Sequence, residues 1–195
     1  MEQINDHLID RLQTRIPSDA LWHGHHARLI DGTGLSMPDT KANQARWPQS
    51  KSQKPGCGFP SMNLVGIFCL HTGSLLKSAT GDRHCHETRL FQSIWSALKP
   101  GDLAVADRGF CSYAAVAGLL TRKVSCLMRL PENKMRKAIG SQLPKTANFD
   151  VIVPWKRPAK CPRTMTPPSL TSCPKASWCA WSAMTSPNVA FALRA

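Results

Sequence analysis

The sequence predicts an α/β fold in which helices flank a mixed β-sheet. Two short apolar runs, residues 28–31 and 103–107, each end in an aspartate with a glycine close behind. Such runs are typical of buried strands that end in a turn. Apolar residues at helical spacing lie before, between and after further strand-like runs. An order of three strands followed by alternating helices and strands predicts one sheet with helices packed against it.

The first half of the chain predicts a helix and three strands. Between residues 4 and 16, isoleucines and leucines are spaced for one face of a helix, which Pro17 ends. The first strand then runs up to Asp31. Residues 62–70 form a nearly continuous apolar run, and residues 74–80 follow after a turn, so the two predict a β-hairpin.

The second half alternates between helix and strand. Residues 87–98 place apolar side chains on one helical face and are followed by a Pro-Gly stop. After the strand that ends at Asp107, Ser112 is suited to cap a helix, and residues 124–130 predict another strand. If the first and fourth strands are neighbours, Asp31 and Asp107 reach the same edge of the sheet.

Asp31 and Asp107 are the candidate catalytic residues. Two facing carboxylates suit a pair of hard divalent cations, Mg²⁺ or Mn²⁺, which can activate an attacking oxygen and stabilise a leaving one. For either aspartate alone, the alternative is a residue that only forms a turn at the end of a strand.

The charge of the chain points to a polyanionic partner. Lys and Arg number 25 against 12 Asp and Glu, for a formal net charge of +13 over 195 residues. Nucleic acid is the commonest partner of so basic a chain. A membrane surface is disfavoured because the basic residues do not line one amphipathic face and no apolar run is long enough to span a bilayer. A soluble basic protein with no such partner is the remaining alternative.

The cysteines and the amino terminus favour the cytoplasm. The eight cysteines include no C-x-x-C pair and no regular spacing, which fits free thiols in a reducing compartment. The first residues lack the basic and apolar regions of a signal peptide. His84-Cys85-His86 has no second ligand pair at zinc-finger spacing, so we interpret it as a loop.

Residues 46–56 form the candidate DNA-binding loop. Arg46, Trp47, Lys51 and Lys54 combine positive charge with an aromatic ring, which suits a phosphate backbone and a splayed base. An ordinary solvated loop is an equally good interpretation. Arg108, beside Asp107, is suited either to a scissile phosphate or to a carboxylate.

Glu87 and Asp39 are two further acidic residues that are not among the candidate catalytic residues. Glu87 stands in the first turn of a predicted helix, where a negative charge complements the helix dipole. Asp39 is an auxiliary acid at most and fits better as a turn residue.

Several motifs together resemble the catalytic core of bacterial insertion-sequence transposases of the insertion-sequence-four family. The resemblance covers roughly residues 21–167 and depends on motifs that occur in the family's order. These motifs are Asp31-Gly32-Thr33, Met37-Pro38-Asp39-Thr40, residues 43–49 (Asn-Gln-Ala-Arg-Trp-Pro-Gln), residues 55–60 (Pro-Gly-Cys-Gly-Phe-Pro) and Asp107-Arg108-Gly109-Phe110.

The resemblance implies a fold, a reaction and partners. It implies a ribonuclease H-like core with an Asp-Asp-Glu triad that holds two Mg²⁺ or Mn²⁺ ions and cuts and joins DNA. Asp31 and Asp107 match the first two acids of that triad. The implied partner is double-stranded DNA at transposon ends, bound in the nucleoid, with a homodimer on DNA as an assembly to test.

The sequence departs from the family at the third acid. That acid is a glutamate in a Tyr-Arg-Glu-Lys signature beyond an inserted β-rich segment, and the sequence contains no such signature. We therefore expect an incomplete core of low activity. The expected parts are a helical segment (1–21), a partial ribonuclease H-like core (22–130), the start of the β-rich insertion (131–167) and a tail (168–195).

The tail differs in composition from the rest of the chain. From Pro168 onward there is no acidic residue and no sustained period of two or 3.6, so neither strand nor helix is specified. With GC-rich codons, residues 173–181 read in a shifted frame give a strand-like sequence similar to the family. We therefore favour an out-of-frame tail over a disordered one.

The functional alternatives to a transposase of low activity are of two classes. One is a non-enzymatic DNA-binding remnant that interferes with full-length transposase. The other is a metal-dependent nuclease of the same fold that uses Asp31 and Asp107 with an unrecognised acid.

Overall fold

The computed structural model describes residues 2–54, 56–130, 149–157, 159, 176–183 and 189–193. The helical elements are α1 (Glu2–Gln13), η1 (Ser18–Ala20), α2 (Lys41–Arg46), α3 (Glu87–Ser93), η2 (Trp95–Ala97) and α4 (Tyr113–Thr121). The strands are β1 (His26–Ser36), β2 (Ser61–Cys69), β3 (Leu75–Asp82), β4 (Asp102–Ala106), β5 (Ser125–Leu130), β6 (Phe149–Lys156), β7 (Ala176–Ala183) and β8 (Val189–Leu193).

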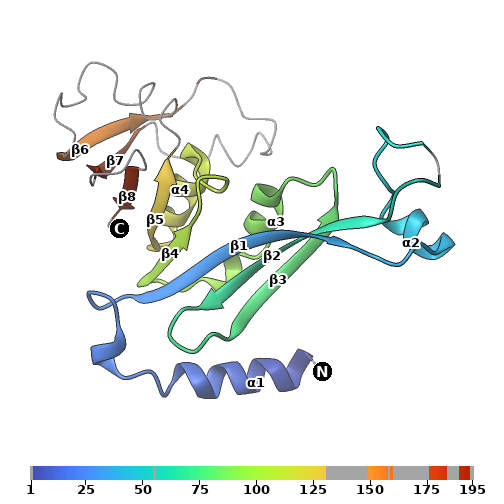
Figure 1. Cartoon of the computed structure of the whole chain (residues 1–195). Coiled ribbons are helices and arrows are strands. Elements are labelled where there is room, and N and C mark those ends of the chain that lie inside the picture. The colour runs from blue at the N-terminus through green and yellow to red at the C-terminus, as the bar shows by residue number, and fades with distance from the viewer. Residues whose placement is uncertain are drawn as a thin grey trace.

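The strands form one mixed sheet in the order β3-β2-β1-β4-β5-β8-β7-β6 (Figure 1). β1, β2 and β3 are antiparallel neighbours, whereas β1, β4 and β5 are parallel. The α/β fold class is confirmed, as is the central position of β1 beside β4. The first five strands have the order expected of a ribonuclease H-like fold.

The hydrophobic core joins the sheet to α3, η2 and α4. Phe91 of α3 is fully buried and meets Trp95 and Phe110 edge to face, with ring centroids 5.7 Å apart in both pairs. Ile30 of β1 and Val116 of α4 belong to the same buried cluster. Because one cluster unites these elements, the helices support the central strands from a common side.

The helix expected over residues 87–98 is divided. α3 ends at Ser93, and the short helix η2 follows after Ile94. Trp95 lies so close to Gly118 of α4 that a Cβ on that glycine would come within 2.5 Å of the indole ring. The break therefore accompanies the packing of Trp95 against α4, a tertiary contact that the helical period does not reveal.

The expectation that β1 ends at Asp31 is wrong. β1 continues to Ser36 because β2 pairs with it along its whole length, from Arg28 opposite Cys69 to Ser36 opposite Ser61. The parallel pairing with β4 does end at this point, at Ile30 opposite Ala106. Asp31 is thus the first residue of β1 beyond the end of its parallel neighbour.

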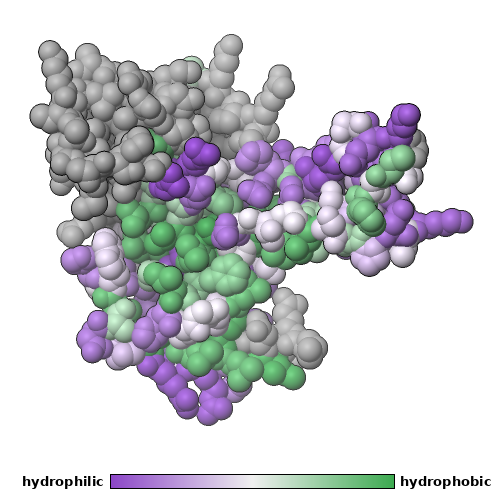
Figure 2. Space-filling view, in the orientation of Figure 1, coloured by the Kyte–Doolittle hydropathy of each residue, from purple (hydrophilic) through white to green (hydrophobic). Residues whose placement is uncertain are grey.

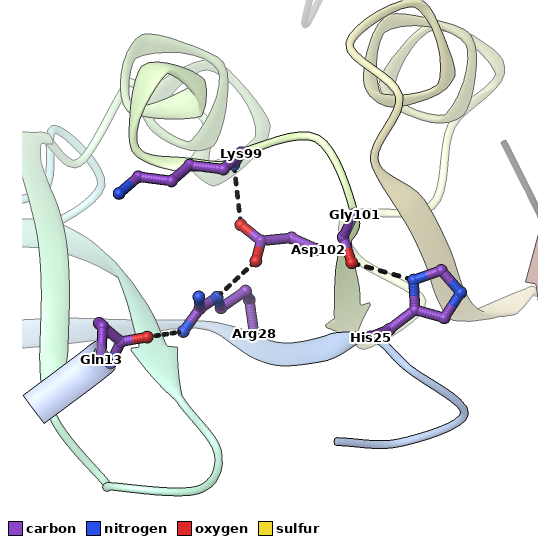
Figure 3. Close-up of polar contacts among 6 residues, drawn as sticks. All are labelled: Gln13, His25, Arg28, Lys99, Gly101 and Asp102. Atoms are coloured by element: carbon purple, nitrogen blue, oxygen red, sulfur yellow. Dashed lines mark hydrogen bonds and ion pairs between the residues drawn. The ribbon is translucent and has the colours of Figure 1, made fainter. Parts of the chain in front are cut away.

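A buried ion pair joins β1 to β4 at the opposite end of their parallel pairing (Figure 3). Arg28 Nε donates to Asp102 Oδ1 at 2.9 Å, and the two side chains are only 6% and 2% exposed. The backbone N–H of Lys99 donates to the other Asp102 oxygen at 2.8 Å, and Gln13 Oε1 accepts from the Arg28 guanidinium. Both oxygens of the buried carboxylate are therefore satisfied.

Three strands continue the sheet beyond β5. β8 pairs with β5, and β7 joins β8 to β6. β6 agrees with the strand expected within residues 149–155. β7 and β8 lie in the tail, where the sequence period specified no element. The reading-frame hypothesis and the division into segments remain predictions, and most of residues 131–175 lie outside the described part of the chain.

Within the described ranges, no helix combines the length and the apolar character needed to cross a membrane.

Loss of the buried guanidinium should destabilise the protein strongly. In Arg28→Met, the Asp102 carboxylate stays buried without its charged partner, so we expect the free energy of unfolding to fall by about 3–5 kcal/mol. Urea denaturation followed by tryptophan fluorescence measures this change. Arg89→Met, at an exposed position of α3, is the matched control. The double variant Arg28→Met/Asp102→Leu should recover most of the loss, and a double variant as unstable as the single one would contradict this account.

Candidate active site

Asp31 and Asp107 lie side by side at the carboxyl end of the parallel pairing. Ile30 is opposite Ala106 in the parallel register, and the residue that follows each of them is an aspartate: Asp31 within β1 and Asp107 just after the end of β4. Neighbouring strands lie about 4.8 Å apart. In parallel strands, paired residues direct their side chains to the same face. The structure therefore brings the two expected acids together.

The Asp31 carboxylate is exposed and only partly engaged. Its Oδ1 accepts a hydrogen bond from the backbone N–H of Gly32 at 2.8 Å. Among the described residues, its other oxygen has no hydrogen-bond or ion-pair partner. This oxygen is available to a cation or a water molecule.

The Asp107 carboxylate is paired with an arginine that the sequence analysis did not single out. Arg129 Nη1 lies 3.6 Å from Asp107 Oδ1, and the two side chains are 48% and 57% exposed. Ala106 is opposite Met128 in the parallel register of β4 and β5, which places Arg129 beside Asp107. Arg108 is exposed and, in the described part of the chain, forms no ion pair with either aspartate.

Glu87 brings a third carboxyl group to this end of β1. It is the first residue of α3, whose preceding residue His86 caps the helix by accepting from the N–H of Thr88. Its carboxyl carbon lies 2.9 Å from the position that a Cβ on Gly32 would occupy, and its oxygens lie 3.0 and 3.3 Å from it. From the sequence we interpreted Glu87 only as a first-turn charge that complements the helix dipole. The position of a residue in a helix does not reveal which strand its side chain contacts.

The carboxylate groups at this end of the sheet are of the ligand type that suits a hard divalent cation. Carboxylate oxygens are the ligands that Mg²⁺ and Mn²⁺ prefer. Across the described ranges, however, no three or more His, Cys, Asp or Glu residues are arranged to hold a metal ion. Asp31 and Asp107 are the adjacent pair around which such a site would form.

The candidate DNA-binding loop lies away from the two aspartates. α2 and residues 47–54 and 56–60, which we call the arm, occupy the far end of the ribbon formed by β1 and β2 (Figure 1). Figure 2 shows a largely hydrophilic surface over the arm. Lys51 and Lys54 are exposed there, and the Arg46 guanidinium lies 5.3 Å from the centre of the Trp47 ring.

Two glutamines fix the shape of the arm. Gln49 Nε2 donates to the carbonyl of Lys54 at 2.8 Å, and its Oε1 accepts from the N–H groups of Gly56 and Gly58 at 3.2 Å each. Gln44 Nε2 donates to the Gly58 carbonyl at 3.0 Å and to Asp39 Oδ1 at 2.7 Å. Asp39 thus holds Gln44 in place, in agreement with a turn role. The sequence analysis quoted both glutamines within a family motif but gave them no structural role, although a polar side chain inside a Gly- and Pro-rich loop is a signal for such bonds.

The comparisons with known proteins concern most of the chain. Residues 22–166 match the family described as the transposase DDE domain. No curated protein matches the chain. Among solved structures, the piggyBac transposase synaptic complex with hairpin DNA, determined by cryo-electron microscopy, is similar with a TM-score of 0.45 and 7% identity.

That similarity covers 86% of this chain but 32% of the piggyBac chain. The chain therefore spans about a third of that transposase's length. So low a TM-score transfers no property from it. The family match stands by itself, because it takes in well over half of the sequence and includes Asp31, Glu87 and Asp107. The chain belongs to the family of transposase DDE domains.

Proposed function

We propose that this chain is the DNA-cleaving core of a transposase of the insertion-sequence-four type, in which Asp31 and Asp107 bind divalent metal ions beside the scissile phosphate. The observation that carries the proposal is the parallel register of β1 and β4, which ends one residue before both aspartates. In a chain of the transposase DDE domain family, Asp31 and Asp107 would be the first two acids of the triad, and this register supports that assignment.

The residues at this end of the sheet have distinct parts in the proposed reaction. Mg²⁺ or Mn²⁺ at this position would supply activation of the attacking oxygen and stabilisation of the leaving one. Asp31, with one unengaged oxygen, would hold the shared ion. Asp107 would hold an ion on its side of the pair. Arg129, whose Nη1 lies 3.6 Å from Asp107 Oδ1, would turn its guanidinium to a DNA phosphate.

The arm supplies the proposed contact to the DNA backbone. Its exposed lysines and its Arg46–Trp47 pair belong to a chain with a net charge of +13. Because Gln44 and Gln49 hold the loop in one shape, little conformational entropy is lost when phosphates bind. Arg108 would add a contact close to the aspartates.

We expect turnover by these 195 residues to be low. The Tyr-Arg-Glu-Lys signature that would supply the third acid is absent from the sequence. Removal of one ligand from a metal site weakens both metal binding and orientation of the substrate. Metal and DNA binding are therefore better tests than the rate of strand transfer.

Bound Fe²⁺ should cut the polypeptide at the proposed site. With ascorbate and hydrogen peroxide, Fe²⁺ held in place of Mg²⁺ releases hydroxyl radicals locally, so we expect fragments that end near residues 31 and 107. Gel electrophoresis and mass spectrometry identify the fragments, and excess Mg²⁺ should suppress them.

Asp31→Asn should abolish these fragments while it changes the free energy of unfolding by less than about 1 kcal/mol, because the side chain is exposed. Fragments that persist in Asp31→Asn, or that map elsewhere, would refute the metal site.

DNA binding should depend steeply on salt and on the arm. Each phosphate contact contributes about 0.9 to the slope of log affinity against log salt concentration. In Lys51→Ala/Lys54→Ala, we expect weaker binding to a labelled duplex and a slope smaller by about 2. Fluorescence anisotropy at several salt concentrations measures both. Lys99→Ala, an exposed lysine at the opposite end of β4, serves as the control, and equal slopes in the double variant and the control would rule the arm out.

Nicking of supercoiled plasmid separates the alternatives. Mg²⁺-dependent nicking that Asp107→Ala abolishes would favour a nuclease of the same fold. Sequence-specific DNA binding without metal-dependent nicking would favour the non-enzymatic remnant, for which the missing signature is the supporting observation.

A further inference from the structure

Phe59 is an aromatic residue that the arm holds out into solvent. It is 66% exposed, more than any other large hydrophobic residue in the described part of the chain. Singly exposed apolar side chains are common on protein surfaces. The two neighbours of Phe59 are nevertheless buried, since Gly58 and Pro60 both lie within the folded arm. The chain therefore comes to the surface at this one residue, and the ring projects from it.

Hydrogen bonds fix the backbone on both sides of Phe59. The two glutamines of the arm bond to the carbonyl and to the N–H of Gly58, at 3.0 and 3.2 Å. The Pro60 carbonyl accepts from the N–H of Met37 at 2.9 Å, and the proline ring fixes its own φ. Because neither neighbour is free to move, the loop cannot rearrange to bury the ring. The exposure of Phe59 is thus a fixed property of the arm.

The surroundings of Phe59 are basic. Residues 41–60 contain four cations and no acidic residue; the cations are Lys41, Arg46, Lys51 and Lys54. Nucleic acid matches both features, because its phosphates attract the cations and its bases offer flat π-faces on which an aromatic ring can stack. Charge complementarity therefore favours DNA as the partner of this ring.

Trp47, the other aromatic residue of the arm, is less available to a base. It is half-buried, and the Arg46 guanidinium lies 5.3 Å from the centre of its ring. Its carbonyl accepts from the N–H of Ser61, the first residue of β2, at 3.2 Å. A cation over one face of the indole excludes a base from that face. Of the two rings in the arm, Phe59 is therefore the one that presents an open surface.

A hollow of about 480 Å³ in the arm is lined mainly by polar residues, Lys51 and Gln53 among them. A Cβ on Gly58 would overlap the side-chain amide of Gln53, so this amide rests on the backbone one residue before Phe59. Among the described residues, the amide forms no hydrogen bond. An amide both donates and accepts, which suits the edge of a nucleobase. A base that stacks on Phe59 would therefore find a hydrogen-bonding group nearby.

We propose that Phe59 is a base-contacting residue of the arm, and that its ring stacks on a nucleobase displaced from the base stack of double-stranded DNA. The inference rests on the proposed function, because the lysines of the arm must first bring the duplex to the ring. It adds a contact with the bases to the contacts that the lysines make with phosphates. A base leaves the duplex at the least cost where it is already unpaired, so this contact favours DNA with an unpaired base beside the arm.

Two duplexes that differ by one unpaired base test the inference. We would measure the affinity of the full chain for a labelled matched duplex and for the same duplex with one bulged thymine, by fluorescence anisotropy at fixed salt. The original chain should bind the bulged duplex about fivefold or more tightly, since a base–aromatic stack contributes at least this factor. Phe59→Ala should lose the preference, and Phe59→Trp should keep it. Leu70→Ala, at a residue 60% exposed just beyond the other end of β2, is the matched control and should keep it too.

Phe59→Ala should leave the urea midpoint and the salt dependence of binding unchanged, because the side chain is exposed and carries no charge. A preference that persists in Phe59→Ala, or that the original chain lacks, would overturn the inference. The proposed function survives that result if Lys51→Ala/Lys54→Ala still lowers the salt slope. Equal weakening of both duplexes in Phe59→Ala would assign the ring to the DNA backbone or to a second copy of the chain, and would also overturn it. An original chain that binds neither duplex would overturn both proposals.

Discussion

The parallel register of β1 and β4 is the constraint on which the candidate site depends, and the Arg28–Asp102 ion pair fixes it. The pair lies at one end of the parallel pairing, and Asp31 and Asp107 lie just beyond the other. A slip of one residue would send one aspartate to the opposite face of the sheet. It would also leave Arg28 and Asp102 apart in an apolar interior, which is far more costly than their burial as a pair. The ion pair therefore contributes specificity more than stability.

The strand order could be predicted from the sequence because it follows from local signals. Apolar runs, the Pro-Gly stop after residue 98 and the Ser112 cap each belong to a few neighbouring residues. The central place of β1 follows from packing rules for strands and crossover helices. What failed was the end of β1, since Asp31-Gly32 has the composition of a turn but pairs with Gly66 and Val65 of β2. Local composition gives no information about a partner strand that is more than thirty residues away in the sequence.

The candidate site was predictable only in part, for a related reason. Asp31 and Asp107 each follow an apolar run, so their position at the sheet edge could be inferred before their neighbours were known. Arg129 meets Asp107 only through the register of β4 and β5, and Glu87 meets Gly32 only because α3 packs against β2 and β3. Neither contact can be recognised from the spacing of residues in the sequence. Gly32 was interpreted as a turn residue, whereas its structural importance is the close approach of a side chain from another element.

The extension of β1 past Asp31 has a geometric consequence for the proposed DNA complex. The six residues from Asp31 to Ser36 carry the chain about 16 Å along the strand to the end of the ribbon, from which residues 37–40 lead into the arm. Along one strand of duplex DNA, successive nucleotides are about 3.4 Å apart, so this length corresponds to about five base pairs. A duplex that follows the β1–β2 ribbon would thus meet the arm about half a helical turn from the phosphate at Asp31. The arm would set where along the DNA the carboxylates act, because the β1–β2 pairing and the two glutamines make the connection between them stiff.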